Sequence, residues 1–236
     1  MTTDELAVKR AIRRSTVQRL LDGVYSRARK LPRATSEYEV TRGLRIPMRD
    51  GVELVADLYS PLPVSRGIVL VRSPYGRRTP FSNEFARLYA ERGFTVLLQS
   101  CRGTFGSGGS KMPFQGELED GADTVEWMRR QPWFTGRFAT VGVSYLGFNE
   151  WALLMDPPPE MVTAVMSSAP HNFGRIFTDG GALAVEMALG YSDTISHQER
   201  DGFLGGLRRG RSAKRRHASV LTALPLAGGS GVSQRR

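Results

Sequence analysis

The sequence is poor in cysteine, in long apolar runs and, toward its end, in acidic residues. A single cysteine, Cys101, excludes an intrachain disulfide. No apolar stretch reaches the roughly 18 residues that a transmembrane helix needs, so no membrane span is expected. No apolar signal segment follows Met1, which favours a cytoplasmic location. The 236 residues, 40% of them hydrophobic, suffice for one α/β core or two small domains.

Acidic side chains are absent from residues 202–236, where eight lysines and arginines lie. Subtracting these eight from 33 leaves 25 basic against 23 acidic residues, so residues 1–201 carry +2 of the total charge of +10. No aromatic residue follows Phe203, whereas nucleic-acid sites usually combine basic with stacking aromatic side chains. We therefore expect a solvated tail without a nucleic-acid or membrane partner; the alternative is a tether to nucleic acid or to an acidic membrane.

Apolar residues at helical spacing from Leu6 to Val24 predict an N-terminal helix that ends near Gly23. Its outer face is basic, with Lys9, Arg10, Arg13, Arg14 and Arg19. A surface helix is the expected structure. A mitochondrial-type presequence is the alternative, against which Asp4 and Glu5 argue.

The central part of the sequence alternates short apolar runs with helical stretches. A hairpin is expected first, with strands over 38–46 and 52–59 around an Asp50-Gly51 turn. Further strands are expected over 68–71, 94–98, 138–143 and 162–166, and helices over 83–92, 118–130 and 148–155. This order predicts an α/β protein with a mostly parallel, mixed sheet covered by helices on both faces. The Gly-, Ala- and Leu-rich stretch 179–196 is expected to be helical and to begin an inserted lid.

One serine stands at the turn between a predicted strand and a predicted helix. It is the centre of Gly142-Val143-Ser144-Tyr145-Leu146-Gly147. This is the layout of a nucleophile elbow, in which a sharp turn exposes the hydroxyl. Such a serine needs a base, usually histidine, and donors that stabilise the oxyanion. The residues alone leave two interpretations, a nucleophile or a serine that caps the helix, because Leu146 stands where the common pattern has glycine.

Several other motifs accompany this one. They are Arg49-Asp50-Gly51-Val52, Ser73-Pro74-Tyr75-Gly76, Cys101-Arg102-Gly103-Thr104-Phe105-Gly106-Ser107, Ser168-Ala169-Pro170 and Gly180-Gly181-Ala182-Leu183. By these motifs and their order, residues 38–191 resemble the cocaine esterase / X-Pro dipeptidyl-peptidase group of α/β-hydrolases. The resemblance implies the α/β-hydrolase fold and a serine hydrolase that cleaves an ester or amide through an acyl-enzyme.

The resemblance also implies roles for particular residues. Ser144 would be the nucleophile, and the Tyr75 phenol and the Tyr145 backbone N–H would be the oxyanion donors. A core-packed turn residue is the alternative role for Tyr75. The group often has Asp where this chain has Cys101, which puts the support of that loop in question; nothing marks Cys101 as a rival nucleophile. His171, just after the last predicted strand, is a candidate substrate contact or simply a polar strand-end residue.

The catalytic acid and histidine are not assigned. In this fold they follow the serine in the chain, on loops beyond the lid. The remaining candidates are His171, His197, His217, Asp179, Asp193 and Asp201, and none follows a further predicted strand. We expect a chain truncated within the helical lid, and an inactive fragment. The expected divisions are an N-terminal basic helix and linker (1–35), the N-terminal part of the hydrolase core (36–172), the start of the lid (173–210) and a basic, disordered tail (211–236).

Other functions stay open at this point. A non-catalytic hydrolase remnant or binding module is one alternative, and an interaction protein acting through its basic tail is another. Expected substrates are small esters, amides or peptides, with dipeptidyl-peptidase activity a property of part of the group. No cofactor or metal is expected, because no His, Cys or acidic cluster has ligand spacing and residues 103–109 lack the ending of a phosphate loop. The oligomeric state is not readable.

Overall fold

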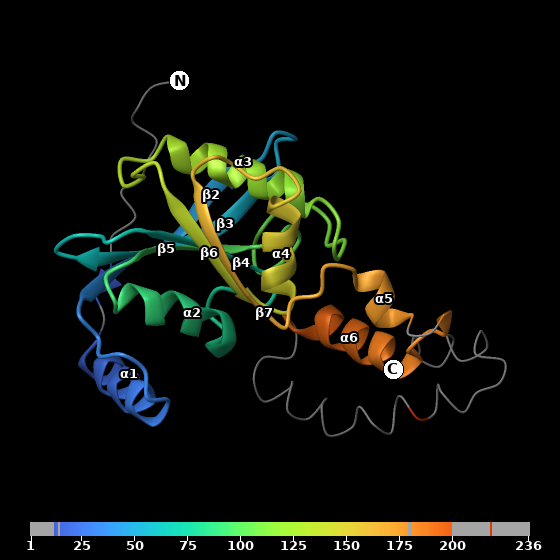
Figure 1. The fold of residues 1–236 in the computed structure, drawn as a ribbon, viewed down its shortest axis with the longest axis horizontal. Helices are drawn as coiled ribbons and strands as arrows, with labels where there is room; N and C mark the ends of the chain where they lie inside the picture. Colours follow the sequence, from blue (N-terminus) through green and yellow to red (C-terminus); the bar gives the residue numbers. More distant parts are fainter. Residues whose placement is uncertain (1–11, 14, 179–180, 200–217, 219–236) are drawn as a thin grey trace. The chain divides into compact units, whose positions relative to one another are not determined.

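The computed structural model describes residues 12–13, 15–178, 181–199 and 218 (Figure 1). The chain divides into two compact units, a first unit Met1–His171 and a second unit Asn172–Arg236. Asp179, Asp201, His217 and all of the expected 211–236 tail except Ala218 lie outside the described residues.

The first unit contains all the described strands and four of the helices. In chain order these are β1 (Ile12–Arg13), α1 (Thr16–Ala28), β2 (Glu37–Pro47), β3 (Glu53–Leu62), β4 (Ile68–Ser73), α2 (Pro80–Ala90), β5 (Thr95–Ser100), α3 (Glu117–Arg129), β6 (Phe138–Val143), α4 (Tyr145–Leu153) and β7 (Met161–Ser167). The described helices of the second unit are α5 (Phe173–Phe177) and α6 (Val185–His197). Within the described residues, no helix is both long and apolar enough to cross a membrane.

The strands form one seven-stranded sheet in the order β1-β2-β3-β5-β4-β6-β7. Strands β1, β2 and β3 pair antiparallel in succession, and β3 pairs antiparallel with β5. From β5 to β7 all neighbours are parallel. The predicted hairpin is present as β2 and β3, and the predicted mixed sheet is confirmed.

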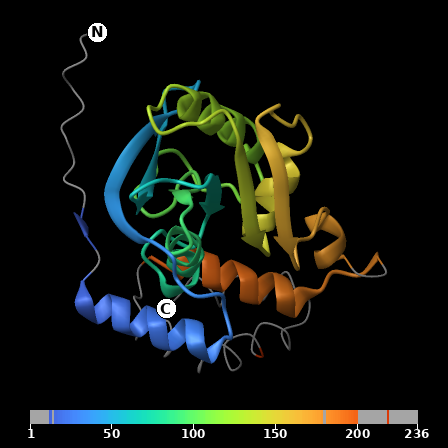
Figure 2. The same ribbon diagram turned by 60° about the vertical axis from the view of Figure 1, so that its left-hand side comes forward.

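The core lies on both faces of this sheet. Leu70 and Leu97 pack on one face with Met128 of α3, whereas Val71 and Leu98 pack on the other face with residues of α2. Successive residues of β4 and β5 thus serve opposite faces, as the period of a strand requires. In both ribbon views α2 and α3 lie on opposite sides of the sheet (Figures 1 and 2). The expectation of helices on both faces is therefore confirmed.

Two predicted helix boundaries are wrong. Ile12 belongs to strand β1, and α1 continues through Gly23 to Ala28. A glycine costs a helix only about 1 kcal/mol, so it need not end one. Two residues beyond the end at Ala28, Lys30 has a φ of 52°, and the Leu31 N–H donates to the Ser26 carbonyl at 2.9 Å, which closes the last turn.

The helix expected over 179–196 starts later than predicted. Gly181 has a φ of 87°, which a right-handed helix does not contain, and α6 begins only at Val185.

Candidate active site

The parallel strands bring several loops to one edge of the sheet. Ser73 of β4 is in register with Ser100 of β5, and Val143 of β6 with Ser167 of β7. The residues that follow these strands therefore emerge side by side. This edge, at the carboxyl ends of parallel strands, is where open α/β sheets bind ligands.

Ser144 occupies the turn between β6 and α4 in a backbone conformation that residues other than glycine rarely adopt. Its φ is 56° and its ψ is −122°. The turn is fixed on both sides, because the Ser144 N–H donates to the Ser167 carbonyl at 3.1 Å and its own carbonyl accepts from the Phe148 N–H at 3.0 Å. The Ser144 hydroxyl makes no capping hydrogen bond to α4. The geometry is that of a nucleophile elbow, and the helix-cap interpretation finds no support in it.

Two glycines make this turn possible. A Cβ at Gly142 would lie 2.5 Å from the carbonyl carbon of Leu146, and a Cβ at Gly147 would lie 2.4 Å from the Cβ of Ala169. Both distances are too short for real contacts, so side chains are excluded at these positions. The close packing of α4 on the Ala169 turn explains why the second glycine stands three residues after the serine.

Tyr75 lies on the loop after β4, near Ser144. Burial raises the pKa of the Tyr75 phenol, and the neighbouring Ser144 side chain acts in the opposite direction. The phenol therefore keeps its proton at neutral pH and stays a donor. The Tyr75 ring packs edge-on against the rings of Phe81 and Tyr145, with centroids 5.5 and 6.5 Å away.

Arg77 anchors the loop that carries Tyr75. Its Nη1 donates to the backbone oxygens of Val55 (3.2 Å) and Phe105 (3.1 Å). The same atom donates to Ser100 Oγ at 2.6 Å, and Nε donates to Asp57 Oδ1 at 3.3 Å. The loop is thus tied to β3, to β5 and to the loop after β5. No sequence motif indicates this role, because it depends on which strands become neighbours.

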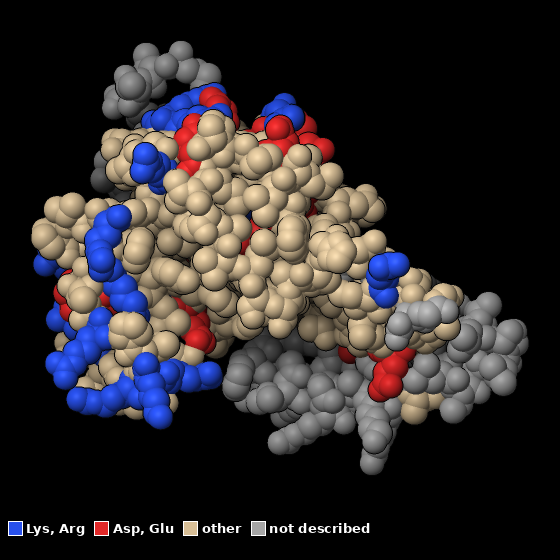
Figure 3. Space-filling model, in the orientation of Figure 1, with Lys and Arg blue, Asp and Glu red and all other residues tan. Residues whose placement is uncertain are grey.

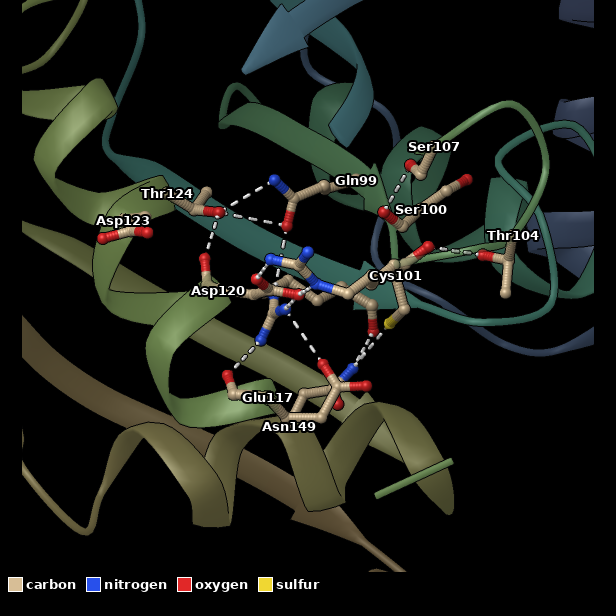
Figure 4. A network of polar contacts seen from close by, with 12 residues as sticks. Gln99, Ser100, Cys101, Thr104, Ser107, Glu117, Asp120, Asp123, Thr124 and Asn149 are labelled. Carbon is tan, nitrogen blue, oxygen red and sulfur yellow. Dashed lines mark hydrogen bonds and ion pairs between the residues drawn. The ribbon is translucent and has the colours of Figure 1, made fainter. Parts of the chain in front are cut away.

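A buried ion pair joins the two segments that hold the candidate oxyanion donors. Arg72, at the end of β4, places Nη2 2.9 Å from Glu117 Oε2 and donates from Nη1 to the Glu117 carbonyl at 2.7 Å. The Tyr145 hydroxyl donates to the other Glu117 oxygen at 2.8 Å. Figure 4 shows this network, in which Gln99 accepts from Arg72 Nε at 2.9 Å. Glu117 therefore connects the strand that leads to Tyr75 with the residue after Ser144.

Cys101 is part of the support of this network. Asn149 of α4 donates from Nδ2 to the Arg72 carbonyl at 2.8 Å and to Cys101 Sγ at 3.4 Å (Figure 4). Burial raises the pKa of the Cys101 thiol well above its usual range. A thiol that keeps its proton is a poor nucleophile, which agrees with the expectation that Cys101 does not compete with Ser144.

The loop after Cys101 is held without a carboxylate at that position. The Cys101 N–H donates to the Ser73 carbonyl at 3.0 Å, and Thr104 Oγ1 donates to the Cys101 carbonyl at 2.7 Å. The next residue, Arg102, forms ion pairs with Asp50 (2.7 Å) and Asp120 (2.5 Å). The loop is therefore supported although Cys101 stands where related sequences often have Asp.

His171 is the only histidine of the first unit. It is exposed and lies beyond the end of β7, with its ring edge-on to Trp151 at 6.2 Å. Trp151 Nε1 donates to the Ala169 carbonyl at 3.2 Å, which holds this segment against α4. Among the described contacts of the first unit, no histidine is hydrogen-bonded to Ser144. In α6 of the second unit, His197 Nδ1 lies 2.9 Å from the Asp193 carbonyl.

Comparisons with known proteins agree with this geometry. Residues 50–221 match the X-Pro dipeptidyl-peptidase (S15) family. The cocaine esterase of Rhodococcus sp. (strain MB1 Bresler) is 35% identical over 178 aligned residues, which cover 67% of this chain and 29% of the esterase. The crystal structure of an aminopeptidase from a marine-sediment Thaumarchaeota archaeon is similar at 28% identity with a TM-score of 0.58, over 67% of this chain and 30% of that one.

A third protein is similar to this chain in fold alone. An esterase of Pyrococcus furiosus has a TM-score of 0.52 at 17% identity, over 69% of this chain and 63% of its own. The chain spans less than a third of the length of the cocaine esterase and of the aminopeptidase. The predicted α/β-hydrolase fold and the resemblance to this group are both confirmed. The chain belongs to the X-Pro dipeptidyl-peptidase (S15) family, a family of serine-hydrolase type.

Proposed function

We propose that Ser144 is the nucleophile of a serine hydrolase that cleaves an ester or amide bond through an acyl-enzyme. The observation that carries the proposal is the strained strand-to-helix turn that holds Ser144, with a φ of 56°, at the carboxyl edge of the sheet, near the Tyr75 phenol. Strained conformations of this kind are frequent at active sites, and here the turn holds one half-buried hydroxyl near a protonated phenol. The two proposed oxyanion donors are the Tyr75 hydroxyl and the Tyr145 backbone N–H.

The reaction would follow the acyl-transfer sequence. The Ser144 oxygen attacks the carbonyl carbon, its proton passes to a base, and the oxyanion is stabilised by the two donors. The leaving alcohol or amine departs with a proton, and water then releases the acid from Ser144. The described contacts of the first unit place no histidine against Ser144. We propose that residues 1–236 supply the nucleophile and the oxyanion donors, and that by themselves they turn over substrate slowly.

The proposed substrates are small esters or amides, with peptides among the amides. The names of the relatives, an esterase and an aminopeptidase, include both bond types. We assign His171 to the wall of the substrate site, because it is exposed beyond the end of β7 and its ring rests on Trp151. Trp151 and His171 together would offer an apolar surface with one polar edge.

The test uses p-nitrophenyl acetate, whose good leaving group needs little help from a base. With one triad member removed, serine proteases keep roughly 10³- to 10⁴-fold of catalysis over water through their oxyanion holes and substrate binding. We expect a burst of p-nitrophenol and one acetyl group per chain, mapped to Ser144 by peptide mass spectrometry. Tyr75→Phe should slow the burst by about 10²-fold, since it removes one oxyanion donor.

Two control variants define the outcome. Ser144→Ala should abolish the acetyl adduct, and Tyr89→Phe should react like the wild type because Tyr89 lies on α2 and packs against Phe94. Acetylation that persists in Ser144→Ala would contradict the assignment of the nucleophile. A folded chain with no adduct at all would favour the alternative, a non-catalytic hydrolase remnant.

A further inference from the structure

Helix α1 packs on the rest of the first unit through its polar side. The side chain of Asp22 is buried and forms an ion pair with Arg87 of α2. The Tyr25 hydroxyl donates to Glu84 of the same helix. Ser26, one turn after Asp22, is buried as well. Side chains that usually face water thus form the attachment of α1.

The apolar side of α1 faces outward. Val17, Leu20 and Val24 are 68%, 71% and 64% exposed, and their spacing of three and four residues places them on one face of the helix. Single exposed apolar residues are common, but a surface helix of a globular protein normally turns such a stripe toward the core. The orientation of α1 is therefore the reverse of the usual one, and its stripe is available to a partner.

At the C-terminal end of α1 and just beyond it lie cations that have no ion-pair partner among the described residues. Arg27, Lys30 and Arg33 are exposed, and none of the three forms an ion pair with a described residue. Together with Arg19, which forms an ion pair with Glu37, they line a groove of about 630 Å³ beside α1, on the side of Asp22 and Ser26. Its two acidic lining residues, Asp22 and Glu91, are buried and lie against arginines. Figure 3 shows Lys and Arg side chains gathered over the α1 region, at the lower left.

A helix with an exposed apolar stripe, and with cations near its C-terminal end that pair with no described acidic residue, fits an anionic lipid surface. An interfacial helix inserts its apolar side chains at the level of the headgroups while Lys and Arg bind lipid phosphates. Nucleic acid would engage the cations but would gain little from exposed valine and leucine. We propose that α1 and the basic groove next to it bind the surface of a membrane rich in anionic lipids. The sequence-based expectation of no membrane partner rested on the lack of a spanning segment and on the composition of the basic tail, and a surface contact through α1 involves neither.

Co-sedimentation of the full 236-residue chain with vesicles tests the proposal. We expect binding to vesicles of phosphatidylcholine and phosphatidylglycerol in equal parts, weakening as salt is added, and little binding to phosphatidylcholine alone. Two double variants should each bind the anionic vesicles at least about tenfold more weakly. One reverses charges, Arg27→Glu with Lys30→Glu. The other removes the stripe, Leu20→Gln with Val24→Gln.

Matched controls separate α1 from the rest of the surface. Arg78→Glu with Arg137→Glu changes the net charge equally at exposed sites off α1, and Val64→Gln with Met112→Gln alters exposed apolar residues elsewhere. Both controls should bind like the wild type. All four positions in the α1 variants are exposed, and circular dichroism verifies that the variants fold. If the α1 variants bind as the wild type does, or if the chain binds duplex DNA or polyglutamate but not anionic vesicles, the proposal is overturned.

Discussion

The middle of the sheet and its β7 edge contain similar residues in different surroundings. Strand β5 (Thr95–Ser100) is buried along its whole length, between β3 and β4 and under helices on both faces. Strand β7 (Met161–Ser167) is also free of charge, yet its Val162 and Val165 are 59% and 52% exposed. Among the described strands β7 pairs only with β6. Apolar composition therefore marks a segment as a strand, whereas its neighbours decide how much of it is buried.

Two buried glutamates repeat this contrast. Glu117, near the middle of the sheet, has the Arg72 guanidinium and the Tyr145 hydroxyl as partners. Glu150, on α4, accepts from Thr140 Oγ1 at 2.7 Å and pairs with no cation among the described residues, so burial raises its pKa to about 8. The first carboxylate is stabilised by an opposite charge, and the second is accommodated mainly by keeping its proton.

The largest effect is expected from breaking the central pair. Glu117→Ala leaves the Arg72 charge buried without its partner, which should cost about 3–5 kcal/mol of unfolding free energy. Urea denaturation measures this cost. The matched control is Glu126→Ala, which removes ion pairs with Arg129 and Arg130 on the exposed side of α3 and should cost less than about 1 kcal/mol. Equal costs for the two variants would show that the buried pair does not support the middle of the sheet.

A smaller effect compares the two strands directly. Leu97→Ala removes a fully buried side chain from β5 and should cost about 3 kcal/mol. Val165→Ala trims an exposed side chain on β7 and should cost less than about 1 kcal/mol. Chemical denaturation of both variants gives the comparison. Should Val165→Ala prove as costly as Leu97→Ala, another surface must cover β7 in solution.

The last comparison concerns Glu150 and pH, and its effect is the smallest of the three only per pH unit. Between its ordinary pKa of 4.5 and about 8, the folded chain retains the Glu150 proton while the unfolded chain releases it. The folded state then binds more protons, so this group makes the unfolding free energy fall as pH rises, by up to about 1.4 kcal/mol per pH unit. Glu150→Gln should remove this contribution in denaturation curves recorded across that range.

The control for this pH experiment is Glu119→Gln, on an exposed position of α3, which should keep the wild-type dependence. A Glu150→Gln variant with an unchanged pH dependence would mean that Glu150 titrates in the same way folded and unfolded.

Local sequence patterns predicted most of the fold because the information lies within a few residues. The strand over 138–143 and the turn at Ser144 are where the pattern placed them, and the hairpin around Asp50-Gly51 is present. The end of α1 was missed, because Lys30 adopts the left-handed conformation that sequence reasoning reserves for glycine.

Contacts between distant segments were not predictable in the same way. The role of Arg77 depends on Val55 and Phe105, more than 20 residues away on either side. From the sequence, Glu117 would be interpreted as an acidic residue at the start of a helix, where its charge interacts favourably with the helix dipole. Its actual partners come from β4 and α4. The assignments of Ser144, Tyr75, Tyr145 and His171 to catalysis or binding stay predictions until the acylation experiment is done.

The anchoring of the Tyr75 loop by Arg77 has a thermodynamic consequence. A loop fixed to β3 and β5 through one guanidinium has already lost its conformational freedom when the chain folds. A ligand that accepts a hydrogen bond from Tyr75 would therefore not have to order the loop, and its binding entropy would carry no contribution from that step. Releasing the anchor, by Arg77→Met, would move this ordering from the folding reaction to the binding reaction.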